Sequence, residues 1–275
     1  MFSCSSSIAG PYLAAMRPCG CLLAGFLVLS APARAQTVPP SLEGMWSDPP
    51  VTILARFCAS WCTDAGVARL NALLDDPSND NRPLNQLQGE AAAYQRDSYI
   101  KPRLTPAALE TFPLDPADDP GLLKCEPWGL ARQMFAPHQI EIRRRGSDRI
   151  ELHYGEWDAR RVVYMDGRAR PAGPPTRLGF SVGRWEGGTL VVVTSGVAAS
   201  QTIWWSKHSE RLRVVERFTR SADGATLNLV ATPEDPWSLR EPLTIKRNWR
   251  WAPTSEIAPY VDCEPPISVK KAGGR

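Results

Sequence analysis

The stretch 211–220 alternates like a strand and carries one acidic side chain on its apolar face. Alternation places Glu216 among the apolar residues Leu212, Val214 and Phe218, while the opposite face carries three arginines. A carboxylate in apolar surroundings needs a cation, or it stays protonated near neutral pH. A carboxylate held in this way can act as a general base, so Glu216 is the first candidate for chemistry.

The same alternation brings further polar side chains to the apolar faces of other strand-like stretches. His138 begins the first of these faces, Glu156 ends the second and Arg247 lies within the last. If all the faces point inward, we expect Glu216 to act as a general base and Arg247 to stabilise developing negative charge. His138 or His208 would supply the proton.

Ligand contacts are expected from Glu156, Tyr164 and Trp249 on these same faces. Each assignment has a structural alternative. Glu216 and Arg247 can form an internal ion pair that fixes the register of the strands. Glu156 can reach water at the end of its strand, and Tyr164 can be a core residue with its hydroxyl at the rim. Trp249 can be one of ten tryptophans that fill the core or stack on an aromatic ligand.

The three histidines have alternatives of the same kind. His138 can be a hydrogen-bonded structural histidine, and His208 can lie in a surface loop. His153 falls on the face opposite Ile150 and Leu152, so we expect it to point outward. The chain has no H-E-x-x-H motif, phosphate-binding Walker loop or dinucleotide fingerprint, and we expect no cofactor and no metal.

Residues 1–35 resemble a secretory leader. Arg17 precedes a short apolar run, and the small-residue sequence 33–35 (Ala-Arg-Ala) would be the cleavage site; Met16 is an alternative start. The run is too short to span a bilayer, although a retained anchor is the alternative. Removing 35 of the 275 residues leaves 240, with 30 basic and 29 acidic side chains. This balance argues against nucleic-acid binding, and the leader predicts a periplasmic or secreted protein without stable membrane insertion.

Four cysteines remain after the leader: Cys58, Cys62, Cys125 and Cys263. An even number in an exported chain favours disulfides, and four cysteines allow three pairings. We favour Cys58 with Cys62 and Cys125 with Cys263. A zinc site is the competing interpretation, but the four cysteines contain no C-x-x-C pair and have no neighbouring histidine.

The mature chain divides into an α-rich and a β-rich part. Residues 36–124 form a Pro-rich opening segment and a helical cap, in which Thr63 and Thr105 precede apolar residues at helical spacing. Residues 125–263 switch to a period of two, and 264–275 form a flexible tail. The predicted strands are 139–144, 149–156, 160–165, 177–185, 189–195, 211–220, 225–233 and 241–251.

The connections between these strands contain hairpin chemistry, such as Asp166-Gly167 and Glu186-Gly187-Gly188. Eight sequential antiparallel strands without helices between them predict an up-and-down β-barrel of the lipocalin or calycin kind. A barrel of this size has room for one small ligand.

Several motifs between residues 125 and 236 resemble a large set of exported, mainly uncharacterised bacterial proteins. The segments are 125–129 (CEPWG), 163–168 (VYMDGR), 181–192 (SVGRWEGGTLVV), 208–210 (HSE), 216–218 (ERF) and 234–236 (EDP). The chain departs from those proteins at Gly188, where they often have aspartate, and after Cys263, where they have His-Glu-Gly-Asn. The resemblance implies the architecture and the compartment and carries no activity.

Residues 44–46 (Gly-Met-Trp) are similar to the G-x-W opening of lipocalin-type barrels, in which a late arginine packs over the tryptophan. That similarity implies Arg247 or Arg250 as a structural partner of Trp46.

The sequence thus predicts an exported barrel that binds a small, partly apolar or aromatic molecule in its interior, with acid–base catalysis of the lyase or isomerase type. The alternatives are a carrier protein without catalysis and a structural envelope protein with a filled barrel. The oligomeric state is not determined by the sequence.

Overall fold

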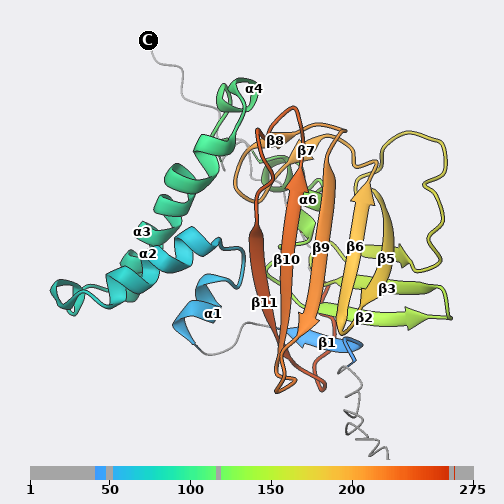
Figure 1. Ribbon diagram of the computed structural model, residues 1–275, viewed down its shortest axis with the longest axis horizontal. Coiled ribbons are helices and arrows are strands. Elements are labelled where there is room, and N and C mark those ends of the chain that lie inside the picture. Colours follow the sequence, from blue (N-terminus) through green and yellow to red (C-terminus); the bar gives the residue numbers. More distant parts are fainter. Residues whose placement is uncertain (1–40, 48–51, 116–118, 260–262, 264–275) are drawn as a thin grey trace, which may run out of the picture. The chain divides into compact units, whose positions relative to one another are not determined.

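In a computed structural model, residues 41–47, 52–115, 119–259 and 263 are described, and they are dominated by a closed β-barrel (Figure 1). Going around the barrel, the strand order is β1-β11-β10-β9-β6-β5-β4-β3-β2. The predicted leader, residues 1–35, and the predicted tail, residues 264–275, lie outside the described residues.

All eight predicted strands are present. They are β2 (Ile140–Arg145), β3 (Arg149–Tyr154), β4 (Arg160–Tyr164), β5 (Phe180–Glu186), β6 (Thr189–Ser195), β9 (Arg213–Arg220), β10 (Thr226–Glu234) and β11 (Ile245–Trp251). The mainly β, closed-barrel prediction is therefore confirmed. It is incomplete in two respects, because β1 (Gly44–Ser47) closes the barrel as a ninth strand between β2 and β11, and β4 pairs with β5 in parallel.

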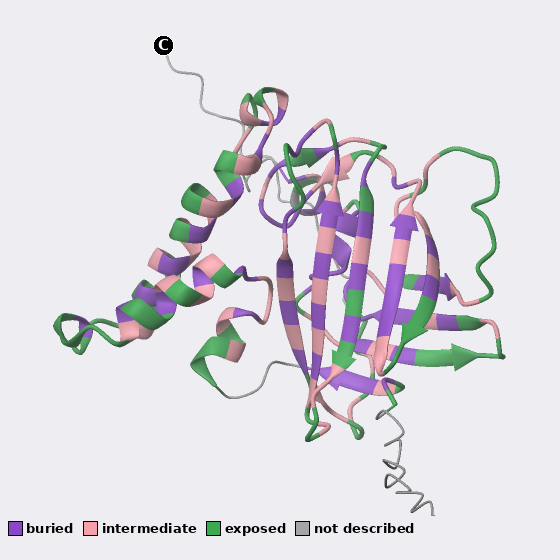
Figure 2. Cartoon of the chain, viewed as in Figure 1, coloured by how far each residue is buried: buried purple, intermediate pink, exposed green. Residues whose placement is uncertain are grey.

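Strand alternation is visible in the burial pattern (Figure 2). Along β10, every second residue from Leu227 to Pro233 is buried, and along β9 the buried residues are Val214, Glu216 and Phe218. Tight turns separate the strands, and Gly187 between β5 and β6 has a φ of 59°, a conformation that favours glycine. The predicted alternation of buried and more exposed residues is therefore confirmed in these strands.

The predicted G-x-W segment is β1, which explains its residue types. Trp46 is fully buried and packs edge-to-face with Trp251, with ring centroids 4.8 Å apart. Gly44 has a φ of 123°, and a Cβ at this position would lie 2.4 Å from the Trp251 ring. The arginine over these rings is Arg220 at the end of β9, 5.0 Å from the Trp46 centroid. The expectation of Arg247 or Arg250 was wrong, because β9 brings a different cation to that end of the barrel.

The predicted helical segment contains α1 (Ile53–Phe57), α2 (Asp64–Leu74), α3 (Leu84–Tyr94) and α4 (Pro106–Leu109), with short 3-10 turns η1 (Pro77–Asn79) and η3 (Lys101–Arg103) and the π-helical turn η2 (Gln95–Ile100). Thr63 caps α2 and Thr105 caps α4, as their positions predicted. The helices α2 and α3 enclose a small core of their own: Leu70, Leu73, Leu87 and Ala91.

Backbone hydrogen bonds tie this segment to the barrel, and both predicted disulfides are present. The disulfide between Cys58 and Cys62 forms as predicted, and Cys62 exchanges two backbone hydrogen bonds with Lys246 of β11. The second predicted disulfide, between Cys125 and Cys263, also forms. Cys125 follows the short helix α5 (Pro120–Leu123).

Between β6 and β9 the chain leaves the barrel and forms a separate hairpin of β7 (Ser200–Gln201) and β8 (Lys207–His208). The tip of this hairpin is buried, since Trp204 is 1% exposed and belongs to the main core together with Ile203. The short helix α6 (Leu130–Gln133) contacts β7. These two elements place His208 outside the barrel sheet, where its 3% exposure differs from the surface-loop alternative.

Candidate functional site

Glu216 is fully buried in the barrel, as predicted, but its partner is Arg161 of β4. The guanidinium of Arg161 donates to both carboxylate oxygens, including a bond of 2.9 Å from Nη1 to Oε1. Arg161 also donates to the Ser181 hydroxyl at 2.8 Å and to Thr194 Oγ1 at 2.6 Å. The expected pairing with Arg247 was wrong, because four different strands bring these side chains together.

This cluster, which we call the interior ion pair, has the features of a structural element. Glu216 is 0% exposed and Arg161 is 3% exposed. Both oxygens of the carboxylate already accept charge-assisted hydrogen bonds, so the pair is well compensated in a region of low dielectric. The geometry therefore favours the ion-pair alternative for Glu216 over a role as general base.

Ser181 lies in a stretch, 179–183 (Gly-Phe-Ser-Val-Gly), that matches the G-x-S-x-G pattern of hydrolase nucleophiles. In hydrolases that serine lies on a sharp turn between a strand and a helix. Here Ser181 lies within the barrel strand β5, is 1% exposed, and is bonded to Arg161 and Thr194. Ser181 is therefore part of the interior ion pair, and its position does not have the geometry of a hydrolase nucleophile.

Arg247 and Trp249 lie on β11 and are both buried. The Arg247 guanidinium packs over the Trp249 ring at 4.2 Å and donates to the backbone carbonyl of Ala136. Trp249 Nε1 lies 3.4 Å from the carbonyl oxygen of His138. Both residues thus hold the segment that leads into β2, and they contact His138 through its backbone.

His138 and Glu156, two of the predicted site residues, form an ion pair with each other. His138 Nε2 lies 2.7 Å from Glu156 Oε2, and the side chains are 37% and 3% exposed, respectively. The expectation that Glu156 reaches water was wrong, because the chain turns sharply after β3 and folds this side chain inward. Burial raises the pKa of Glu156 to about 7, while the charge of Arg132 acts in the opposite direction.

A carboxyl with such a pKa can give up or take a proton near neutral pH. The backbone of Glu156 is fixed, since its carbonyl accepts a hydrogen bond of 3.0 Å from Gln133 of α6. His138 and Glu156 therefore form an acid–base pair, although Glu216 is no part of it.

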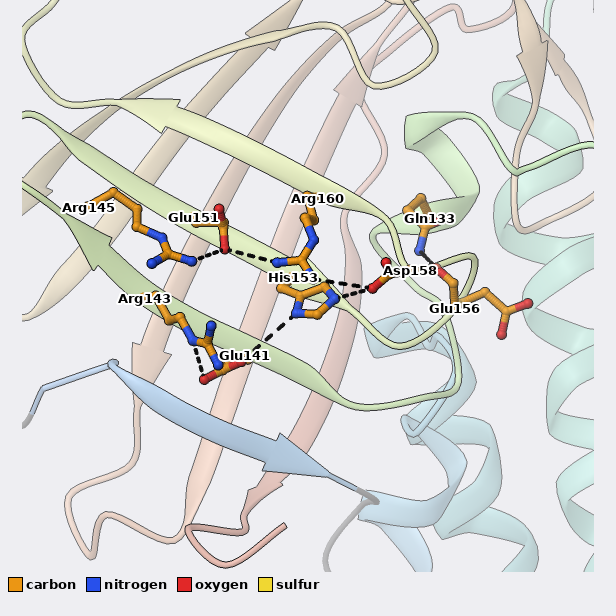
Figure 3. A network of polar contacts seen from close by, with 9 residues as sticks. All are labelled: Gln133, Glu141, Arg143, Arg145, Glu151, His153, Glu156, Asp158 and Arg160. Atoms are coloured by element: carbon orange, nitrogen blue, oxygen red, sulfur yellow. Dashed lines mark hydrogen bonds and ion pairs between the residues drawn. The ribbon is translucent and has the colours of Figure 1, made fainter. Parts of the chain in front are cut away.

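The turn that carries Glu156 also directs a second carboxylate to a second histidine. Trp157 and Asp158 have φ values of 58° and 43°, and Asp158 Oδ1 lies 2.5 Å from His153 Nε2. In Figure 3, Asp158 points toward His153 while Glu156 extends away from it. His153 lies on the predicted face but is only 5% exposed, so the expectation of an open external histidine was wrong.

The outer face around His153 is a network of paired charges. Figure 3 shows Arg143 bonded to Glu141, and Arg145 bonded to Glu151 at 2.8 Å. These opposite charges compensate one another along β2 and β3, which gives the face a structural explanation.

Tyr164 is half-buried at the end of β4. Its ring stacks on Phe180 with centroids 5.0 Å apart, and the Arg168 guanidinium packs over it at 4.4 Å. These contacts account for the ring, so the structure favours a packing role over the expected ligand contact.

The remaining candidate, His208, lines a pocket of about 410 Å³ beside the β7–β8 hairpin. Besides His208, the wall contains the half-buried Trp237, the exposed Lys207 and side chains of β7 and its neighbours: Ala199, Ser200, Gln201 and Ser209. We call this the hairpin pocket. A smaller pocket of about 190 Å³, which includes Arg132 and Trp128, shares the wall residues 199–201.

Asp235 holds the two sides of the hairpin pocket in place. Its carboxylate accepts from the backbone N–H and the hydroxyl of Ser209, both at 2.7 Å, from the Ser238 hydroxyl at 2.8 Å and from the Trp237 N–H at 3.2 Å. Burial opposes its ionisation, yet these bonds keep the pKa of Asp235 below its usual value. The motifs 208–210 and 234–236 therefore meet at this pocket.

His208 is 3% exposed, and its Nδ1 lies 3.0 Å from the carbonyl oxygen of Ser209. Burial lowers the pKa of His208 below its usual value, against the opposing effects of the Ser209 carbonyl and Asp235. Within the part of the chain that the structure describes, the other ring nitrogen, Nε2, has no hydrogen-bond partner.

Sequence reasoning missed Arg161, Trp237 and Gln201. Arg161 could have been found, because it shares the apolar face of its strand with Val163 and so must be compensated inside the barrel. Trp237 and Gln201 carry no comparable signal, since they follow from how loops meet.

Neither a metal site nor a membrane-spanning helix is found among the described residues. No three histidine, cysteine, aspartate or glutamate side chains converge there as a metal site requires. None of the described helices combines the length and the apolar character needed to cross a bilayer.

No protein-family model, curated protein or solved structure matches this chain. The resemblance to exported bacterial proteins therefore stays a prediction, and the function is argued from geometry.

Proposed function

We propose that this protein binds a small, largely apolar or aromatic molecule in the hairpin pocket. The supporting observation is a pocket of about 410 Å³ whose lining includes the half-buried Trp237 and the buried His208. Ligand sites of this size are concave and mostly apolar, with a few polar groups that fix orientation. The proposed ligand site is therefore the hairpin pocket. It differs from the site predicted in the barrel interior, where Glu216 is already paired with Arg161.

The compartment of this binding protein is outside the cytoplasm. Two disulfides, one of which joins Cys125 to Cys263 across 138 residues, favour an oxidising environment, and the leader at residues 1–35 agrees with export. A periplasmic or secreted carrier of a small molecule fits both observations.

The proposal can be tested by placing a large side chain at the rim of the pocket. Ala199 is exposed and lines the pocket, so we expect Ala199→Phe to abolish binding of ethylbenzene and indole probes, followed by tryptophan fluorescence and calorimetry. Ala172→Phe, at another exposed alanine, is the matched control and should bind as the unchanged protein does. Equal binding by both variants, or no binding by the unchanged protein, would overturn the proposal in favour of a structural protein with a filled barrel.

Acid–base catalysis is a second candidate, favoured by the 2.7 Å contact between His138 and Glu156 and by a Glu156 pKa of about 7. A lyase or isomerase step would use Glu156, in place of Glu216, to accept a proton. Once a converted ligand is known, Glu156→Gln should abolish turnover without changing its affinity. Unchanged turnover by Glu156→Gln would contradict acid–base catalysis by this residue and leave the non-catalytic carrier as the proposed function.

A further inference from the structure

We infer that the helical segment carries a second binding site, a groove between α1 and α3 that takes a small carboxylate with an apolar body. The groove has a volume of about 410 Å³, and both helices are labelled in Figure 1. Among the described residues it shares no lining residue with the hairpin pocket, so the two sites are separate. We call it the helix groove. Its volume is in the range of small-molecule sites.

The apolar body of the ligand follows from the lining of the helix groove. Phe57 and Trp61 are half-buried and provide aromatic surface, while Leu84 and Ala92 provide aliphatic surface. A ring or a short hydrocarbon chain between these side chains would remove apolar surface from water on both sides, which is favourable.

Gly89 keeps the helix groove open. It lies inside α3, where glycine is less stable than alanine. The fold does not require a glycine there, because the backbone is helical and a Cβ at this position would meet no atom within 4 Å. What the glycine provides is open space in the wall of the groove, into which a ligand can pack.

A buried amide supplies a hydrogen-bond donor in the lining. Gln95 is 1% exposed, and its Oε1 accepts from the backbone N–H of Thr63 at 3.0 Å and from the Thr63 hydroxyl at 3.2 Å. A backbone N–H only donates, so the amide oxygen faces Thr63 and Nε2 is the free end. This Nε2 donates to no described residue, and it is not among the unpartnered atoms that are closed off from solvent. It is therefore available to an acceptor on a ligand.

The charge of the ligand follows from Arg56. Among the described residues that line the helix groove, Arg56 is the one charged side chain, and it forms no ion pair with another described residue. A guanidinium matches the two oxygens of a carboxylate. An ammonium ligand would instead meet a charge of its own sign. The cation at the mouth, the amide donor and the apolar walls together favour an amphipathic carboxylate.

The experiment compares three probes that share one skeleton: 4-phenylbutanoate, 4-phenylbutanamide and 4-phenylbutylamine. Isothermal titration calorimetry at pH 7.5 gives the three affinities. We expect the carboxylate to bind about 5- to 10-fold more tightly than the neutral amide, because its hydrogen bonds with Arg56 and Gln95 are charge-assisted. The amine should bind most weakly.

Substitutions of Gly89 locate the binding. Gly89→Leu places a large side chain in the groove, and we expect it to abolish binding of 4-phenylbutanoate. Since leucine is favoured over glycine inside a helix, the variant should unfold at a higher temperature than the unchanged protein, so lost binding would not reflect a damaged fold. Gly89→Ala is the matched control. Its methyl group meets nothing within 4 Å, and it should bind as the unchanged protein does.

Arg56→Gln tests the charge. We expect this variant to bind 4-phenylbutanoate about 5-fold more weakly and to bind the amide unchanged, since an exposed ion pair contributes little more than this. Arg250→Gln, at another exposed arginine, is the control and should change neither affinity.

Three outcomes would overturn the inference. Equal affinities for the carboxylate and the amide would remove the preference for an anion. Carboxylate binding that persists in Gly89→Leu would place the ligand elsewhere. Absence of binding would also overturn it, and a dimer of the unchanged protein that Gly89→Leu converts to a monomer on size-exclusion chromatography would then assign the groove to a second copy of the chain. The hairpin pocket is tested separately by Ala199→Phe.

Discussion

The barrel interior and the hairpin pocket both bury an ionisable side chain, but they leave it in opposite states. In the interior, Glu216 is enclosed by Arg161, and Arg161 is completed by two hydroxyl groups. In the pocket wall, His208 has one ring nitrogen, Nδ1, bonded to the carbonyl oxygen of Ser209, and one, Nε2, without a partner in the described structure. Burial alone therefore does not identify a binding site in this protein.

The difference arises from how each group is held. Glu216 lies in the middle of a barrel strand, where its ladder partners Val192 on β6 and Ala231 on β10 are fixed by register. His208 lies on a hairpin that is positioned from behind, through Ser209 and Asp235. The imidazole is therefore fixed through its neighbouring residue, and it lies 3% exposed in the wall of the pocket.

The largest expected change in the free energy of unfolding comes from breaking the interior ion pair. Arg161→Leu leaves Glu216 buried without a cation, and we expect it to lower the free energy of unfolding by about 3 to 5 kcal/mol. The double variant Arg161→Leu with Glu216→Leu should recover most of this loss, because no charge is then buried. Urea denaturation measures both.

A matched control is the exposed pair of Arg213 and Glu234, where Arg213→Leu should change stability by less than about 1 kcal/mol. A double variant no more stable than Arg161→Leu alone would contradict a purely structural role for the pair.

The next effect concerns the support of the pocket. Asp235→Asn removes the charge that Ser209, Ser238 and Trp237 donate to, and we expect a loss of about 2 kcal/mol together with weaker ligand binding. Since the pKa of Asp235 is lowered in the folded protein, its contribution is present above its usual value of 3.8 and is lost as the pH falls through the lowered pKa. Thermal unfolding between pH 2 and 7 should show the difference between the variants shrinking at acid pH. A difference that is constant across this range would argue against the charged form.

A smaller effect belongs to Glu156. Its pKa is raised from 4.5 to about 7, so the protonated carboxyl is the more stable form in the folded protein, and stability is lost as the pH rises from about 4.5 through 7. Glu156→Gln cannot ionise and should lack this loss, which we expect to amount to about 1 to 2 kcal/mol. The exposed Glu256→Gln is the control and should follow the unchanged protein. Parallel stability curves for Glu156→Gln and the unchanged protein would refute the raised pKa.

The smallest expected effect is that of Tyr164→Phe. The ring contacts with Phe180 and Arg168 persist without the hydroxyl, so we expect the free energy of unfolding to change by less than about 0.5 kcal/mol and the affinity for indole to stay the same. A marked loss of affinity would instead restore Tyr164 as a ligand contact and extend the site to β4.

The candidate site could be predicted in part. Alternation correctly buried Glu216, Arg247 and Trp249, and it selected His138 and Glu156 as residues of interest, whereas His208 precedes the alternating stretch. The partners of these side chains could not be predicted from the sequence. Which cation meets Glu216 depends on how β4 and β9 are placed on either side of β5 and β6, and a two-residue period contains no information about that order.

The sequence by itself determined the strands, the inward faces and the capped helices, and its four remaining cysteines favoured the pairing of the two disulfides that form. These depend on local periodicity, turn residues and cysteine count, all of which can be read along the chain. Only the tertiary structure decided that β1 closes the barrel, that Arg161 pairs with Glu216, and that the 208–210 and 234–236 motifs meet around Asp235. The physical reason is that hydrogen bonds and ion pairs between distant segments are set by the packing of whole strands and loops, which no single segment specifies.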